Sequence, residues 1–119
     1  MASDGNVYVS DSANSRTQKS TSDGVFVSKW GTEGTDNGQF DVPVGVAVAS
    51  DGSVYVADTG NNHRIQKFTP EGVFVSKWGT EGVGGGEFNL PYGVSVASES
   101  SVYVAGSFNH RIQKFSVGP

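Results

Sequence analysis

The chain has 119 residues, enough for one modest domain, and it contains 17 glycines and no cysteine. The lack of cysteine excludes a disulfide framework and a thiolate metal site. The net charge of −4 argues against strong non-specific binding of nucleic acid, because such binding needs a basic face.

The first residues, MASDGNVYV, have neither the basic start nor the apolar stretch of a signal peptide. No apolar run in the chain is long enough to span a membrane. We therefore expect no membrane attachment and a cytoplasmic location.

The N-terminal segment, residues 1–23, reads as a degenerate copy of a segment that returns later in the chain. DSANSRTQKSTSD aligns with DTGNNHRIQKFTPE, which is one residue longer. Thr17 and Ser20 replace Ile65 and Phe68, so this copy has lost the apolar residues that would offset its ordering entropy. We expect residues 1–23 to form a weakly ordered partial repeat.

Val7–Ser10 alternates as a strand should, and regular order is predicted to resume at Val25. In Val25–Trp30 the alternation places Phe26, Ser28 and Trp30 on one face. A glycine-rich loop then leads to Pro43. The predicted strands of the next complete unit are Gly45–Val48, Val54–Ala57, Arg64–Phe68 and Val73–Trp78. A further unit supplies three strands, predicted at Gly93–Val96, Val102–Ala105 and Arg111–Phe115.

Two exact repeats fix the period of the chain. GVFVSKWGTEG occurs at Gly24–Gly34 and again at Gly72–Gly82, and HRIQKF occurs at His63–Phe68 and His110–Phe115. A period of roughly 47 residues with several short strands per copy predicts a propeller or a solenoid.

This unit resembles the NHL repeat. The family pattern is matched at Pro43–Val48, Asp51–Asp58, Asn62–Phe68 and Gly72–Gly79. The resemblance extends from about Gly24 to Phe115 and implies the blades of a β-propeller, usually six-bladed. We therefore expect an all-β fold with two four-stranded antiparallel blades in residues 24–119.

Two copies depart from the family pattern. Gly106 stands where the complete unit has Asp58, and Ser15 stands where it has Asn62. A less ordered loop is expected at both places, because Asp58 is predicted to cap its loop through backbone N–H groups.

Two blades do not close a ring, and they leave unpaired strands at both ends. The last three strands lack a fourth, and the strand of Val25, Phe26, Val27, Ser28, Lys29 and Trp30 is a spare fourth strand that a neighbouring copy would accept. Three copies would then form a six-bladed homotrimer, whereas two would give four blades and four would give eight. A piece of a longer propeller is the competing interpretation.

In a four-stranded blade, the loop between the second and third strands lies on the same rim as the loop that leads from the fourth strand to the next blade. NHL propellers bind proteins through such surfaces, so the resemblance implies a non-catalytic binding scaffold with no cofactor. The candidate rim residues are Asn61, Asn62, His63, Arg64, Tyr92, Phe108, Asn109, His110 and Arg111. Some NHL propellers bind RNA on a basic surface, for which Arg64 and Arg111 are the candidate cations here. The alternative role of both arginines is to brace their loops.

An enzyme is the third possibility, because some related propellers are metal-dependent lyases or lactonases whose ligands converge on the central channel. The innermost predicted strands, GVAV and GVSV, bring no His, Asp or Glu to that channel. His63 and His110 lie on the rim without carboxylates at ligand spacing. We therefore expect neither catalysis nor a bound metal.

Overall fold

The computed structural model describes residues 5–49, 51–60, 62–79, 82, 87, 91–98, 101–106 and 111–116. Its elements within these residues are β1 (Val7–Asp11), η1 (Ser12–Asn14), β2 (Arg16–Ser20), β3 (Phe26–Trp30), β4 (Pro43–Val48), β5 (Val54–Asp58), β6 (Arg64–Phe68), β7 (Phe74–Trp78), β8 (Pro91–Ser98), β9 (Ser101–Gly106) and β10 (Arg111–Ser116).

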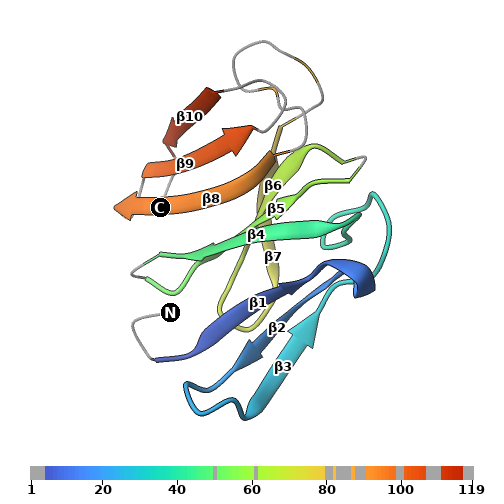
Figure 1. The fold of residues 1–119 in the computed structure, drawn as a ribbon, viewed down its shortest axis with the longest axis vertical. Coiled ribbons are helices and arrows are strands. Elements are labelled where there is room, and N and C mark those ends of the chain that lie inside the picture. Colours follow the sequence, from blue (N-terminus) through green and yellow to red (C-terminus); the bar gives the residue numbers. More distant parts are fainter. Residues whose placement is uncertain are drawn as a thin grey trace.

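The strands form three antiparallel sheets that stack along the longest axis of the molecule (Figure 1). The N-terminal sheet has the order β1-β2-β3, the middle sheet β4-β5-β6-β7 and the C-terminal sheet β8-β9-β10. Strand β4 contacts both β1 and β8, the first strands of the neighbouring sheets. The predicted all-β fold with antiparallel sheets is confirmed.

The middle sheet contains the four strands predicted for one repeat, each beginning and ending within two residues of the expected position. The turn between β6 and β7 closes where the N–H of Gly72 donates to the carbonyl of Thr69 over 2.9 Å. Gly72 has a φ of +87°, which strains any residue with a Cβ. Glycine therefore ends this turn.

A β-bulge changes which side chains of β3 share a face. Ser20 pairs with Phe26 and Lys19 pairs with Ser28, so β3 has one extra residue between these pairs. Trp30 packs against the middle sheet, whereas Phe26 is 56% exposed. The prediction that Phe26 and Trp30 share a face is wrong, because the extra residue reverses the alternation. The same irregularity occurs in β7.

The segment expected to be weakly ordered, residues 1–23, contains two paired strands in its described part. Residues 7–11 pair with residues 16–20 in continuous antiparallel register. Tyr8 is buried in the core shared with the middle sheet, and Thr17 is fully buried. Tyr8 supplies the apolar contact that Thr17 and Ser20 lack.

The strand expected to be donated to a neighbouring copy is paired inside its own chain. Thr17 pairs with Trp30 and Gln18 with Lys29, so β3 is the third strand of the N-terminal sheet. This pairing forms because the preceding segment is itself a strand, which the sequence analysis did not expect. The number of sheets per chain therefore rises from the predicted two to three among the described residues.

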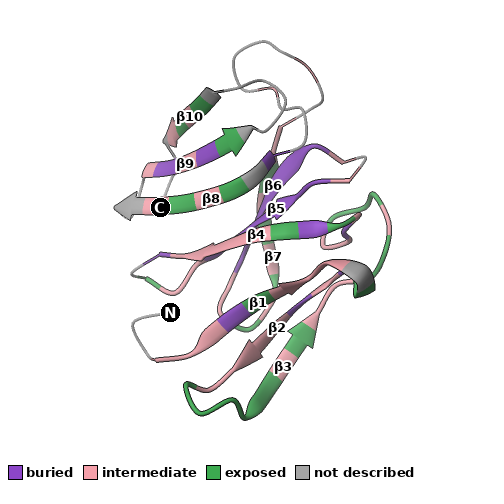
Figure 2. Cartoon of the chain, viewed as in Figure 1, coloured by how far each residue is buried: buried purple, intermediate pink, exposed green. Residues whose placement is uncertain are grey.

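Two apolar layers hold the three sheets together. The buried strands β5 and β6, coloured purple in Figure 2, lie between the two layers. The layer between the N-terminal and middle sheets consists of Tyr8, Trp30, Phe40, Val46, Val48, Val54, Val56, Phe68 and Phe74. The layer between the middle and C-terminal sheets consists of Ala49, Tyr55, Ala57, Ile65, Trp78, Val94, Val96, Val102, Val104 and Phe115. The middle sheet is thus buried on both faces, and its strands β5 and β6 are buried throughout.

Native-state hydrogen exchange will test the order of the N-terminal sheet. Strand β2 lies between β1 and β3, so we expect its amides to exchange far more slowly than those of the exposed turn at residues 21–24. Exchange of β2 as fast as that turn would contradict the paired sheet and restore the expectation of a weakly ordered segment.

Candidate functional site

The loop of residues 31–42 leads from β3 to β4 and lies over the rim of the middle sheet. Phe40 anchors it: this side chain is fully buried, and its ring centroid lies 5.6 Å from that of Phe68. The backbone of Phe40 donates to Thr32 over 2.8 Å and accepts from Gly34 over 3.0 Å. These contacts fix the loop against the sheet, so its carbonyl groups point at defined positions.

Asp58 is the centre of a buried polar cluster beneath this loop. Its carboxylate is fully buried and accepts hydrogen bonds from the amide of Asp41 at 2.7 Å, the side chain of Asn62 at 2.8 Å and Nε of Arg64 at 2.9 Å. The side-chain amide of Gln66 adds a longer contact at 3.2 Å. A buried carboxylate needs such donors, because an unpaired one is costly away from water.

Arg64 joins this cluster to the loop. Its Nη1 donates to the carbonyl of Thr35 at 2.9 Å, and its Nη2 donates to the carbonyls of Asp36 at 3.0 Å and Gln39 at 2.7 Å. Its Nε bonds Asp58, so the planar guanidinium is used on one side by a carboxylate and on the other by main-chain oxygens. Arg64 therefore braces its loop, as the alternative interpretation of this residue predicted.

The contact between a strand glutamine and the bridging loop recurs in the next sheet. Gln66 donates to the carbonyl of Gln39 at 2.6 Å, and Gln113 donates to the carbonyl of Glu87 at 2.7 Å. The glutamine of HRIQKF is thus a loop-binding residue in both copies. The sequence analysis did not select it, although its place in an exact repeat was visible.

The N-terminal sheet has an open copy of the same cluster. The carboxylate of Asp11 accepts from Asn14 at 2.9 Å, from Nε of Arg16 at 3.0 Å and from Gln18 at 3.2 Å. Within the described residues no loop covers it: the side chains of Arg16 and Asp11 are 28% and 24% exposed.

Sequence reasoning missed this open cluster because it aligned Ser15 with Asn62. Ser15 instead has the left-handed backbone of His63, with φ of +54° against +45°. Asn14 makes the bond to Asp11 that Asn62 makes to Asp58. The shorter loop therefore keeps the hydrogen-bonding group while losing one residue.

The two clusters are built from the same residue types, but the pKa values of their carboxyl groups shift in opposite directions. Burial raises the pKa of Asp58 above the usual 3.8, although the Asp41 amide, Asn62 and Arg64 favour its ionised form. Hydrogen bonds from Asn14 and Arg16 lower the pKa of Asp11, where water still reaches the carboxylate. The covering loop therefore decides the sign of the shift.

The predicted rim residues divide into described and undescribed groups. Asn62 donates to Asp58 and to the carbonyl of Gly34, and the side chains of His63 and Arg64 are buried. The remaining predicted residues, namely Asn61, Phe108, Asn109 and His110 together with the side chains of Tyr92 and Arg111, lie outside what the structure describes.

A search with family profiles identifies the repeat that carries this cluster. The NHL repeat profile matches residues 40–68. The chain contains an NHL repeat. The matched NHL residues run from Phe40 through β4 and β5 to the end of β6, so they include Asp58, Arg64 and Gln66.

Solved structures share the fold of this chain at low sequence identity. A structural genomics protein of unknown function from Bacteroides thetaiotaomicron VPI-5482 aligns over 97% of the chain with a TM-score of 0.79 and 23% identity. A streptogramin B lyase aligns over 98% with a TM-score of 0.61 and 15% identity. At these identities, the two similarities establish the propeller-type fold and carry no information on function.

The chain spans about a third of the length of these structures, covering 33% of the first and 38% of the second. No curated protein matches the sequence. In the part of the chain that the structure describes, no helix is long and apolar enough to cross a membrane. The described residues also contain no group of three or more His, Cys, Asp or Glu side chains placed to hold a metal ion.

The two clusters offer a matched pair of arginine substitutions. We expect Arg64→Ala to lower the free energy of unfolding by about 3–5 kcal/mol, because it leaves the buried Asp58 carboxylate without its cation. Arg16→Ala should lower it far less, since water solvates the exposed Asp11. Urea unfolding of both variants measures the difference, and equal losses would contradict the closed and open states assigned to the two clusters.

Proposed function

We propose that this chain is a non-catalytic scaffold of NHL type that associates with further copies of itself and binds polypeptide on its loop rim. The observation that carries self-association is the contrast between the sheets. Side chains that are buried between sheets inside the chain have exposed counterparts on the outer faces of the terminal sheets. Val56 is fully buried and its counterpart Val9 is 51% exposed, while Ile65 is fully buried and Ile112 is 71% exposed.

The number of sheets per chain decides how many copies a ring needs. The predicted homotrimer assumed two blades per chain, because residues 1–23 were not counted. With three sheets per chain, two copies supply the six sheets that the NHL resemblance implies. We therefore favour a ring of two copies, and the three-copy ring is the alternative.

The polypeptide-binding part of the proposal rests on the chemistry of the rim. Arg64 binds three main-chain carbonyls of a glycine-rich loop, so this cluster is suited to a polypeptide backbone. The open cluster around Asp11 and Arg16 presents the same groups with no loop over them in the described residues. Arg64 does not support the RNA-binding alternative, because its nitrogens make hydrogen bonds inside the chain. The lyase alternative rests on the family resemblance and on a structural neighbour of 15% identity.

Solution mass tests the self-association. One chain weighs 12.4 kDa, so light scattering on a size-exclusion column should give twice that mass for a two-copy ring. Three times the mass of one chain would support the three-copy ring of the sequence-based prediction instead. A single chain at all concentrations would contradict self-association.

A peptide of the bridging loop tests the rim. The peptide GTEGTDNGQFD, which copies residues 31–41, should shift the NMR signals of the Arg16 Nε–H and the Gln18 side-chain amide when added at about millimolar concentration. The Arg16→Ala variant is the control and should show no shift at Gln18. Unchanged signals in the unsubstituted chain would count against backbone recognition by this cluster.

A further inference from the structure

The two joints inside the chain are repetitions of one joint. In the first, Trp30 lies with its ring centroid 6.1 Å from Tyr8 on its own sheet and 5.6 Å from Phe68 on the next. In the second, Trp78 lies 6.1 Å from Tyr55 and 5.5 Å from Phe115. The N-terminal and middle sheets therefore each present a Tyr-Trp face to the following sheet, which packs its valines and a phenylalanine against it.

A polar contact also repeats at both joints. The hydroxyl of Ser12 donates to the carbonyl of Pro43 at 2.7 Å, and the hydroxyl of Thr59 donates to the carbonyl of Pro91. Ser12 follows β1 and Thr59 follows β5, and each hydroxyl bonds the first strand of the next sheet, β4 or β8. The same aromatic contacts and the same hydroxyl–carbonyl hydrogen bond thus occur at both joints.

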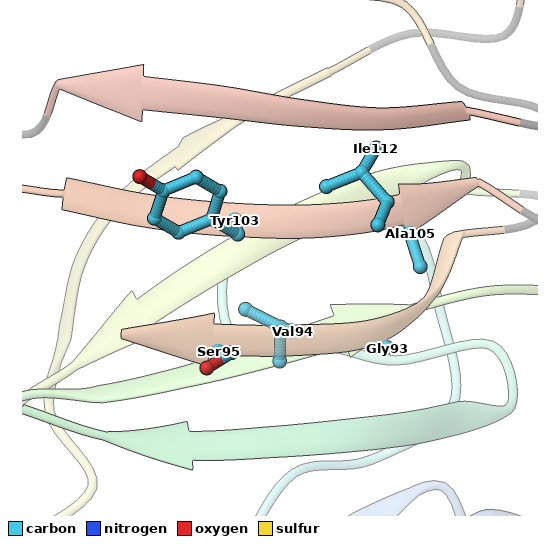
Figure 3. Close-up of a pocket in the computed structure, with 6 residues that line it drawn as sticks. All are labelled: Gly93, Val94, Ser95, Tyr103, Ala105 and Ile112. Carbon is cyan, nitrogen blue, oxygen red and sulfur yellow. The ribbon is translucent and has the colours of Figure 1, made fainter. Parts of the chain in front are cut away.

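The C-terminal sheet lies at one end of the described stack. Its outward side corresponds to the side that the middle sheet packs against its neighbour, and it is here called the C-terminal outer face. It is formed by Gly93, Ser95, Tyr103, Ala105 and Ile112, which line an open apolar cavity of about 240 Å³ (Figure 3). Their counterparts Tyr55, Ala57 and Ile65 are at most 1% exposed under the next sheet.

The N-terminal sheet begins the stack with an unused copy of the receiving face, here called the N-terminal outer face. It includes Val7, Val9 and Phe26, on the side of the sheet opposite to the buried Tyr8. A pair of glycines shows the same difference in contact. A Cβ built on Gly72 would collide with Trp30 of the preceding sheet, whereas a Cβ on the matching Gly24 meets nothing within 4 Å.

The two outer faces fit each other in what they omit as well as in what they present. Phe68 and Phe115 receive the tryptophan of the preceding sheet, but the N-terminal sheet has Ser20 at this position. The described strands of the C-terminal sheet contain no tryptophan that would need a phenylalanine there. The described outer faces therefore lack both members of the tryptophan–phenylalanine contact that the internal joints contain.

The charges at the edge of the joint are also complementary. Inside the chain, Nζ of Lys19 reaches across the first joint to the carbonyl of Pro70 in the turn after β6, at 3.3 Å. The counterpart of Lys19 on the C-terminal outer face is Lys114, which lies 5.9 Å from the Tyr103 ring centroid. The matching turn of the N-terminal sheet contains Ser22 and Asp23, both exposed. Nζ of Lys114 in one copy would thus meet the carbonyl of Ser22 and the carboxylate of Asp23 in the other copy.

We propose that the C-terminal outer face of one copy docks on the N-terminal outer face of a second copy, and so continues the internal joint from chain to chain. This inference rests on the self-association proposed above and states which surfaces carry it. The contact is head to tail, so each copy uses one face as donor and the other as acceptor.

Two charge substitutions test this arrangement, one on each face. Ile112→Glu and Val9→Glu each place a carboxylate at an exposed position that the joint would bury. We expect each variant alone to run as a single chain of 12.4 kDa, with an apparent dissociation constant raised about 100-fold or more. Because both positions are exposed in the single chain, both variants should keep the circular dichroism spectrum of the unsubstituted chain.

Mixing the two variants separates head-to-tail docking from other contacts. The Val9→Glu copy retains an intact C-terminal outer face and the Ile112→Glu copy retains an intact N-terminal outer face. An equimolar mixture should therefore regain association through one joint, to twice the mass of a single chain. Val75→Glu, on the middle sheet at 48% exposure, is the matched control and should leave the mass of the unsubstituted protein unchanged.

The outcomes distinguish this inference from the proposed function. A monomeric unsubstituted chain would overturn both. Association that survives Val9→Glu or Ile112→Glu would overturn the head-to-tail joint and leave self-association standing. A mixture that stays at 12.4 kDa while the unsubstituted chain associates would likewise overturn it.

Discussion

The structure depends on burial of one aromatic layer between each pair of sheets. A sheet of short strands has two apolar faces and cannot bury either by itself. Trp30 and Trp78 solve this in the same way, since each packs on a tyrosine of its own sheet and on a phenylalanine of the next. The middle sheet is the best buried part of the described chain because it receives such a layer on both faces.

The polar interior follows from the same stacking. The loop that carries the chain from one sheet to the next crosses the rim of the sheet that it enters, and its main-chain groups need partners there. Asp58, Arg64 and Gln66 supply these partners. Polar residues that suggest a binding site in the sequence therefore hold a loop in place. The same residue types in the N-terminal sheet have no loop over them among the described residues and stay accessible at Asp11 and Arg16.

A repeated structure also explains why its two ends are the natural places for function. The internal faces and the internal cluster around Asp58 are satisfied by their neighbours in the described stack, whereas the same residue types on the two outer faces have no neighbour among the described residues. The exposed Val9 and Ile112 differ from Val56 and Ile65 in position along the stack and not in residue type. The proposed self-association and polypeptide binding would therefore use surfaces whose internal counterparts already make contacts of these kinds.

The sequence by itself determined the all-β class, the strands of the middle and C-terminal sheets and the repeat unit, because alternation and exact repetition are local properties of the chain. It did not reveal the N-terminal sheet, since Thr17 and Ser20 look unable to hold a strand until Tyr8 is seen against the middle sheet. Only the tertiary structure decided that Arg64 is enclosed and Arg16 is open. Arg64 is enclosed because the loop of residues 31–42 bonds its guanidinium, and the residue types of the cluster do not encode that long-range contact.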